Sequence, residues 1–310
     1  MRIAIIGAGA IGGVLAWYLA PHCDLVIVDQ WADHVAALNR GGLHCERDGV
    51  VEARPVHAVS DPALALPAQL ALVLVKAHQT AWAAEACAAA LAPDGLAYTL
   101  QNGLGNQAIL AGQLGATRVG QGVTTLGGTL LGPGRVRHAG MGATTLSLTP
   151  NPVQANALAD LLNQAGLPTS VTGDLDTLIW GKLIVNAGIN AITALLRVRN
   201  GVLAENSAAR SLLSAVVTEA VRVAEAQGIT LPYTDPVAHV LQVARATAAN
   251  QSSMLQDRLR GAPTEIATIN GAIVAIGTQL GIATPYNATL VALITALEAT
   301  EGAGASVAAA

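Results

Sequence analysis

The stretch "MRIAIIGAGAIGGVLAWYLA", residues 1–20, decides the fold of the N-terminal half. An apolar run predicts a buried strand, and the spaced glycines after it lead into a run with helical spacing. In such a unit the first glycine permits a tight turn, the second lets the backbone approach a pyrophosphate, and the third allows close helix–strand packing. The helix start then offers N–H groups and a partial positive charge to phosphates. The pattern predicts a dinucleotide-binding loop, rather than a plain turn, whose contacts are Gly7, Ala8, Gly9, Ala10, Ile11 and Gly12.

An acidic residue, Asp29, ends the second predicted strand, "DLVIVD". It follows the glycines at about the 20-residue spacing that the dinucleotide motif requires. Its carboxylate can accept hydrogen bonds from the adenosine ribose hydroxyls and would repel a 2′-phosphate. Gln30 follows it and offers no cation, so the sequence favours NAD(H) over NADP(H) as the NAD(P) cofactor. Two alternatives stay open: Asp29 only caps a helix, or Arg40 or His34 reaches a 2′-phosphate.

The rest of the chain divides into two parts of different character. Alternating strands and helices fill the first part, which predicts a mainly parallel sheet with helices on both faces. After about Gly173 the strands give way to amphipathic helices. We therefore predict an α/β, Rossmann-like doubly wound domain over residues 1–172, an all-α domain for substrate and dimerisation over 173–310, and a disordered tail from about 301. The expected helices are Ala10–Ala20, Ala32–Arg40, Thr80–Leu91, Leu175–Leu196, Ser207–Gln227, Pro236–Ala249, Thr264–Leu280 and Pro285–Glu298.

Composition excludes several kinds of partner. Hydrophobic residues make up 52% of the 310 residues, and the net charge is −4 with no basic block, which argues against nucleic-acid binding. The uncharged stretch 266–297 contains Pro285 and polar residues, so two buried helices fit better than a membrane span. Its apolar surface suggests a homodimer. Three scattered cysteines favour reduced thiols in a cytoplasmic protein, and no metal-binding spacing is present.

Polar residues on one predicted helix carry the chemistry. Lys182, Asn186 and Asn190 are spaced four apart, so they lie on one stripe of an otherwise apolar helix. Burying them is costly unless partners compensate, and a substrate with a carboxylate and a carbonyl would supply such partners. Lys182 could then donate a proton to the alkoxide formed when hydride reaches a ketone. The alternative is a lysine that extends to solvent beside two asparagines with purely structural roles.

Further polar positions are open to two interpretations. In "NQSSMLQDRLRGAPTEIATING", residues 250–271, Ser252 or Ser253 could cap a helix and Glu265 could lie in a first helical turn. "VKAHQ" and "LQNGLGN" follow predicted strands, which places Lys76 and Asn102 at the carboxyl edge of the sheet where ligands bind. Asn102 with its following glycine could also form a plain turn.

Taken together, these motifs resemble the 2-dehydropantoate 2-reductase (ketopantoate reductase) family over residues 1 to about 297. The matching segments are "GAGAIGG", "VKAHQT", "QNGLGN", "GVTTLGGTLLGPGRVRHAG", "WGKLIVNAGINAITAL" and "SSMLQDRLRGAPTEIATING". The resemblance implies that Lys182 is the proton donor and that Glu265 helps to hold the cofactor and the active site. It also implies that Lys76 lies near cofactor and substrate, and that Asn102 touches both. The substrate-binding residues that it implies are Asn186, Asn190, Asn200 and Ser253.

The expected activity is hydride transfer from NAD(P)H to a 2-oxo acid, with 2-dehydropantoate reduced to pantoate. One departure bears on this expectation, because NADPH-using members typically carry a basic residue where Gln30 stands. An NAD-dependent D-2-hydroxyacid dehydrogenase acting on another branched or aromatic 2-oxo acid is therefore the first alternative. Related enzymes acting on imines or amino-acid conjugates share the architecture. A dinucleotide-sensing regulator without turnover would need the glycine loop but not the Lys182 stripe.

Overall fold

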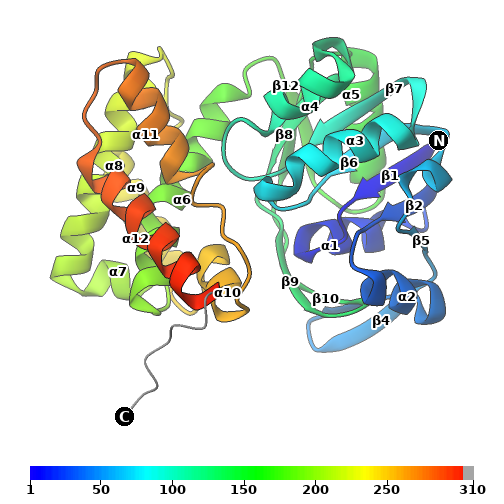
Figure 1. The fold of residues 1–310 in the computed structure, drawn as a ribbon, viewed down its shortest axis with the longest axis horizontal. Coiled ribbons are helices and arrows are strands. Elements are labelled where there is room, and N and C mark those ends of the chain that lie inside the picture. Colours follow the sequence, from blue (N-terminus) through cyan, green and yellow to red (C-terminus); the bar gives the residue numbers. More distant parts are fainter. Residues whose placement is uncertain (303–310) are drawn as a thin grey trace. The chain divides into compact units, whose positions relative to one another are not determined.

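The computed structural model describes residues 1–302 and contains two compact units (Figure 1). The first unit comprises residues 1–101 and 106–175, and the second comprises residues 102–105 and the chain from Asp176 onward. An α/β unit followed by a helical unit is the predicted fold class, which the structure confirms. The predicted tail lies outside the described residues, except for the last two residues of the final helix.

A twisted sheet of eight strands forms the centre of the first unit, in the order β12-β11-β8-β7-β6-β1-β2-β5. All neighbours pair in parallel except β11 with β8. Chain order reverses between β1 and β6, the position at which such sheets bind ligands. The strands are β1 (Arg2–Ile6), β2 (Asp24–Val28), β5 (His57–Val59), β6 (Ala68–Val73), β7 (Leu91–Thr99), β8 (Val119–Thr124), β11 (Thr144–Ser147) and β12 (Thr169–Thr172).

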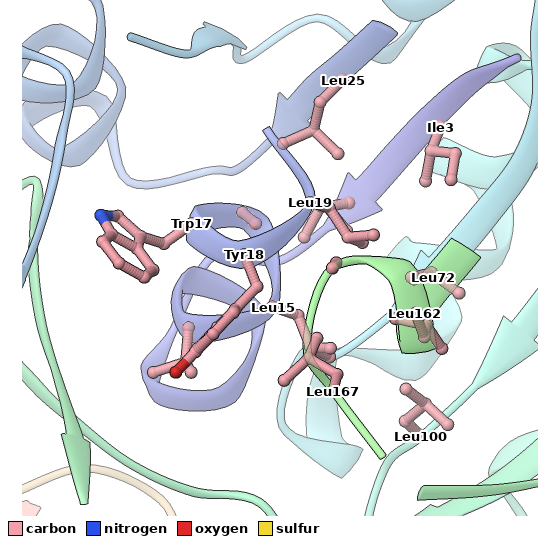
Figure 2. Close-up of a cluster of buried hydrophobic side chains, with 14 of the residues drawn as sticks. Ile3, Leu15, Trp17, Tyr18, Leu19, Leu25, Leu72, Leu100, Leu162 and Leu167 are labelled. Atoms are coloured by element: carbon pink, nitrogen blue, oxygen red, sulfur yellow. The ribbon is translucent and has the colours of Figure 1, made fainter. Parts of the chain in front are cut away.

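Both faces of this sheet are buried. Ile3 and Ile5 of β1 belong to one apolar cluster, whereas Ala4 and Ile6 belong to another. Because successive side chains of a strand point to opposite faces, helices must cover both sides. Figure 2 shows the first cluster, in which α1 residues such as Leu15 lie near the sheet. The helices of this unit are α1 (Ala10–Leu19), α2 (Ala32–Gly41), α3 (Thr80–Ala90), α4 (Asn106–Leu114) and α5 (Pro152–Gln164), with short 3-10 turns η1 (Pro62–Ala65), η2 (Ala77–Gln79) and η3 (Ala116–Arg118).

A second sheet of four strands, in the order β4-β3-β10-β9, packs on α1. The approach is close, because a Cβ on Gly13 would lie 2.6 Å from Val136 Cγ1. The turn at "GPGR", residues 132–135, joins β9 to β10 as an antiparallel hairpin. The strands are β3 (Leu43–Arg47), β4 (Val50–Arg54), β9 (Gly127–Gly132) and β10 (Arg135–Gly140).

The helical unit is built around one long helix, α6 (Asp176–Leu196), which contacts α8, α9, α10 and α12. Among the described residues, this is the one helix long and apolar enough to span a membrane, but 72% of its apolar window is buried inside the structure. It is therefore placed as the core helix of a globular unit. The remaining helices are α7 (Val202–Glu205), α8 (Ser207–Ala226), α9 (Pro236–Ala246), α10 (Ser253–Leu259), α11 (Asn270–Gln279) and α12 (Pro285–Gly302).

One predicted helix is wrong at its start. The expected helix Thr264–Leu280 begins only at Asn270, and Glu265 lies in a non-helical turn rather than in a first helical turn. Tertiary contacts hold this turn, because Leu104 N–H donates to the carbonyl of Thr268 at 2.9 Å. The uncharged stretch 266–297 does form two helices, as predicted. Sequence periodicity also missed α4 and α5.

Candidate functional site

The glycine loop joins β1 to α1, and two of its glycines are required by packing. Gly7 has a φ of +91°, and a Cβ there would lie 2.5 Å from Val75 Cγ1. A Cβ on Gly12 would overlap the carbonyl oxygen of Gly7. Gly9 differs, because among the described residues no atom beyond its chain neighbours and its own helix backbone lies within 4 Å of the Cβ position there. Packing thus requires Gly7 and Gly12, whereas the open space beside Gly9 is what an approaching ligand needs.

No side chain among the described residues competes with a ligand for the N–H groups in the first turn of α1. Gly9 is the N-cap residue, no side chain among residues 1–302 caps the helix, and its first turn carries no acidic residue. Its N–H groups and the positive end of the helix dipole therefore favour an anion. With the open space beside Gly9, the loop fits the pyrophosphate of a dinucleotide.

Asp29 lies directly after β2, and its side chain accepts a hydrogen bond from the backbone of the glycine loop. Its Oδ2 accepts a hydrogen bond from Ala8 N–H at 2.8 Å, and its Oδ1 accepts from Trp31 N–H at 2.9 Å. The alternative in which Asp29 only caps a helix is not seen, since the N-cap of α2 is Trp31. The half-buried Asp29 carboxylate is thus fixed beside the phosphate-binding loop.

The predicted site residue Lys76 also lies in the first unit. It is half-buried, follows Val75, and precedes the turn η2. Val75 is the residue against which Gly7 packs, so Lys76 directly follows a residue that contacts the glycine loop. The carboxyl ends of β1, β2 and β6 therefore carry the predicted cofactor residues of this unit at one edge of the sheet.

In the helical unit, α6 carries the predicted stripe. Lys182 and Asn186 are half-buried, and Asn190 is buried with 6% of its surface exposed. Burial lowers the pKa of Lys182 to about 8, and the charge of Glu265 partly opposes this shift. Glu265 is itself buried. The structure thus places an ammonium group and a carboxylate from distant parts of the sequence close together inside one unit.

Asn102 joins the same group of residues. The segment 102–105 belongs to the helical unit, and Asn102 Nδ2 donates to Glu265 Oε2 at 3.3 Å. Gly103, with a φ of +82°, packs so closely that a Cβ would lie 2.6 Å from the carbonyl oxygen of Thr268. Asn102 is therefore held against the Glu265 turn, a contact that exists only in the folded protein.

The remaining predicted residues lie at the start of α10. Asn190 Nδ2 donates to Ser253 Oγ at 3.4 Å. Ser252, one of the two serines considered as a helix cap, is the N-cap of α10, and its Oγ accepts hydrogen bonds from Leu255 N–H at 3.2 Å and from Thr193 Oγ1 at 2.7 Å.

Sequence reasoning missed Thr193. Its position three residues after Asn190, which extends the polar stripe of α6, was the available signal.

Asn200 lies apart from the α6 stripe, beyond the end of that helix. Its Nδ2 donates to Thr247 Oγ1 at 2.9 Å, and its backbone N–H donates to the carbonyl of Asn250 at 3.1 Å. The side chain is 7% exposed, and its Oδ1 has no hydrogen-bond partner among the described residues. Asn200 thus contacts the segment that leads to Ser253, and its buried Oδ1 is an acceptor without a partner among the described residues.

These features define a class of protein: a dinucleotide-binding α/β unit linked to a helical unit that carries a half-buried lysine, a buried carboxylate and several amides. Such a combination is typical of two-domain dehydrogenases and reductases. The chain belongs to the ketopantoate reductase family. Residues 3–151 match the family description "Ketopantoate reductase PanE/ApbA", and residues 174–298 match its C-terminal domain. As a member, the protein is an NAD(P)-dependent oxidoreductase.

Individual relatives match over nearly the whole chain. A 2-dehydropantoate 2-reductase from Halobacterium salinarum is 37% identical over 299 residues, which cover 95% of this chain and 98% of the relative. A ketopantoate reductase structure from Ralstonia eutropha superposes with a TM-score of 0.90 at 34% identity, covering 97% of this chain and all of the other. A D-mandelate dehydrogenase, solved with NADH and anilino(oxo)acetate, also superposes with a TM-score of 0.90, at 28% identity over 97% of this chain and 99% of the other.

Proposed function

We propose that the protein reduces the keto group of a 2-oxo acid, with 2-dehydropantoate as the first candidate substrate and Lys182 as the proton donor. The observation that carries the proposal is the half-buried Lys182 ammonium on the polar stripe of α6, whose pKa is lowered by desolvation and which interacts with the charge of Glu265. Full-length similarity to 2-dehydropantoate 2-reductases supports the choice of substrate.

A reduced nicotinamide dinucleotide, when bound, supplies the hydride that reduces the keto carbon. Gly9 and the first turn of α1 would hold its pyrophosphate, and Asp29 its adenosine ribose. Lys76, Asn102 and Glu265 are further proposed cofactor contacts.

The helical unit handles the proton and the substrate. Lys182 donates a proton to the oxygen that becomes the hydroxyl, and its positive charge stabilises the developing alkoxide. Glu265 helps to keep that lysine protonated at neutral pH, because its charge opposes the effect of burial. The proposed ligands of the substrate carboxylate and of any distal hydroxyl are Asn186, Asn190, Asn200 and Ser253.

The cofactor is proposed to be NAD(H). Asp29 places a fixed negative charge beside the loop, where a 2′-phosphate would be repelled. Of the two residues that could have bound that phosphate, Arg40 lies in the last turn of α2, about 12 Å along the helix axis from its start at 1.5 Å per residue. His34 is buried, and its Nδ1 accepts a hydrogen bond from Gly134 N–H at 3.0 Å. Neither supports an NADPH site.

A second candidate is an NAD-dependent D-2-hydroxyacid dehydrogenase acting on a branched or aromatic 2-oxo acid. Two observations favour it: the Asp29–Gln30 pair, and the similarity in fold to a D-mandelate dehydrogenase solved with NADH. A regulator that senses the dinucleotide without turnover is the non-enzymatic alternative, and the lowered pKa of the half-buried Lys182 argues against it.

The two units would divide the work between them. Residues 1–172 would bind the dinucleotide, and residues 173–310 would bind the substrate and form a homodimer in the cytoplasm. The exposed apolar residues Leu280, Tyr286 and Leu293, in or beside the last two helices, support dimerisation. A monomeric mass by light scattering at micromolar concentration would contradict it.

A panel of substrates tests the activity. 2-Dehydropantoate, phenylglyoxylate and branched 2-oxo acids are each assayed with NADH and with NADPH. We expect turnover of at least one 2-oxo acid, with NADH preferred. Lys182→Ala should keep NADH binding and lose about 100-fold or more in rate. An unchanged rate in this variant would contradict the assignment of the proton donor, and absence of turnover with every substrate would favour the regulator.

Replacing the Asp29 carboxylate tests the cofactor preference separately. The double variant Asp29→Ser, Gln30→Arg removes the repulsion and adds a cation, so kcat/KM with NADPH should rise while that with NADH falls. The single variant Gln30→Ala serves as the matched control and should leave the preference unchanged. A wild-type protein that uses NADPH better than NADH would contradict the argument from Asp29.

A further inference from the structure

A large aromatic side chain stands at the edge of the glycine-loop region. Trp31 is the N-cap residue of α2, and 41% of its surface is exposed to solvent. Its backbone N–H donates to Asp29 Oδ1, while Asp29 Oδ2 accepts from Ala8 N–H in the loop. One carboxylate therefore connects the backbone of the phosphate loop directly to the backbone of Trp31.

The indole is held in place from behind. The ring of His34 stacks parallel to it, with an interplanar angle of 6° and ring centroids 5.3 Å apart, which is the offset arrangement that aromatic pairs prefer. His34 is 1% exposed, and its Nδ1 accepts from Gly134 N–H in the hairpin that joins β9 to β10. Burial also lowers the pKa of His34, which favours the neutral ring. The Trp31 indole thus has a rigid, uncharged support on one face.

The charges around Trp31 restrict what it could bind. Asp29 precedes it and Asp33 lies in the first turn of α2, whereas the nearest arginine on that helix, Arg40, is in the last turn. A phosphate would be repelled here. A flat, uncharged ring would not be, and stacking on indole is a favourable way to bind a nucleic base.

We propose that the Trp31–His34 pair is the platform on which the adenine ring of the cofactor stacks. The inference rests on the proposed function, since it needs a dinucleotide in the glycine loop. The position of Trp31 supports this role. Asp29 would hold the adenosine ribose, and the next large side chain along the chain is the Trp31 indole, which stacks on His34. Trp31 would supply affinity for the adenosine half of the cofactor and none for the nicotinamide half.

Titration of the full chain with ligand fragments tests this inference. Stacking on an aromatic side chain contributes enough that Trp31→Ala should weaken binding of NADH and ADP-ribose about tenfold. Reduced nicotinamide mononucleotide lacks the adenosine, so the rate with it as hydride donor should change less than about twofold in the same variant. Trp31→Phe should restore most of the affinity. Val153→Ala, which truncates an exposed apolar side chain on α5, serves as the control and should change nothing.

Fluorescence separates stacking from a structural role. ADP-ribose should quench the emission of the wild-type protein, and Trp31→Phe should still bind ADP-ribose but lose that quenching. Equal losses for both halves of the cofactor in Trp31→Ala, or retained quenching in Trp31→Phe, would overturn the inference while leaving the proposed function intact. If the wild-type protein binds no NADH at all, the proposed function fails and this inference fails with it.

Discussion

The pH dependence of 2-oxo acid reduction gives the sharpest test of the site. If Lys182 is the proton donor, only its protonated form is active in the direction of reduction. Its pKa is lowered to about 8 by burial, against 10.5 for an ordinary lysine. The rate should therefore be level near neutral pH and fall as the pH rises through about 8. The reverse oxidation should rise through the same pH, because it needs the neutral amine as a base.

The size of the effect follows from this pKa. With a pKa of about 8, roughly nine-tenths of Lys182 is protonated at pH 7 and roughly one-tenth at pH 9, so kcat/KM should fall about tenfold between them. A lysine with an ordinary pKa would lose almost nothing over this range. Glu265 raises the pKa of Lys182. In Glu265→Gln the decline should therefore begin at a lower pH than in the wild-type protein.

Initial rates at saturating NADH and low 2-oxo acid, measured from pH 6 to 10.5, provide the assay. Lys182→Arg is the matched variant, because it keeps the positive charge but does not titrate below about pH 12. Its kcat/KM should be lower and show no decline between pH 7 and 9.5. A wild-type decline centred near 10.5 would refute the lowered pKa of Lys182, and a decline that persists unchanged in Lys182→Arg would refute the assignment of Lys182 as the proton donor.

Two further predictions concern the glycine loop and the start of α10. Gly12→Ala should lower the melting temperature, because its Cβ would overlap the Gly7 carbonyl oxygen. Gly9→Ala should keep the wild-type melting temperature but bind NADH poorly. Equal losses of melting temperature in the two variants would contradict the open space at Gly9. Ser252→Ala removes an N-cap, so urea unfolding should show a loss of about 1 kcal/mol in the free energy of unfolding. Ser253→Ala should instead raise the KM for the 2-oxo acid with little loss of stability, and the opposite pattern in these two serine variants would argue against the proposed roles.

Local patterns in the sequence determined the fold class and much of the site. The strand–glycine–helix run of residues 1–20 predicted the β1–α1 unit, because the two periodicities and the glycine spacing are set within one short segment. The spacing of Lys182, Asn186 and Asn190 likewise predicted one helix face. A serine cap was one of the two interpretations of Ser252 and Ser253, since a serine before a helical run carries its own hydrogen-bond acceptor, and the structure assigns the cap to Ser252.

Tertiary structure alone decided the surroundings of these residues. The turn that carries Glu265 was predicted as helix, yet it is held by Leu104, some 160 residues earlier in the chain, through its bond to Thr268. No local pattern contains such a contact, because it arises only when the chain has folded. The lowered pKa of Lys182 is of the same kind: the sequence supplied the amine, but burial and the nearby Glu265 set its proton affinity. The sequence by itself thus determined which groups are present and on which elements, and folding determined which of them meet and in what environment, because burial and long-range contacts depend on the whole packed chain.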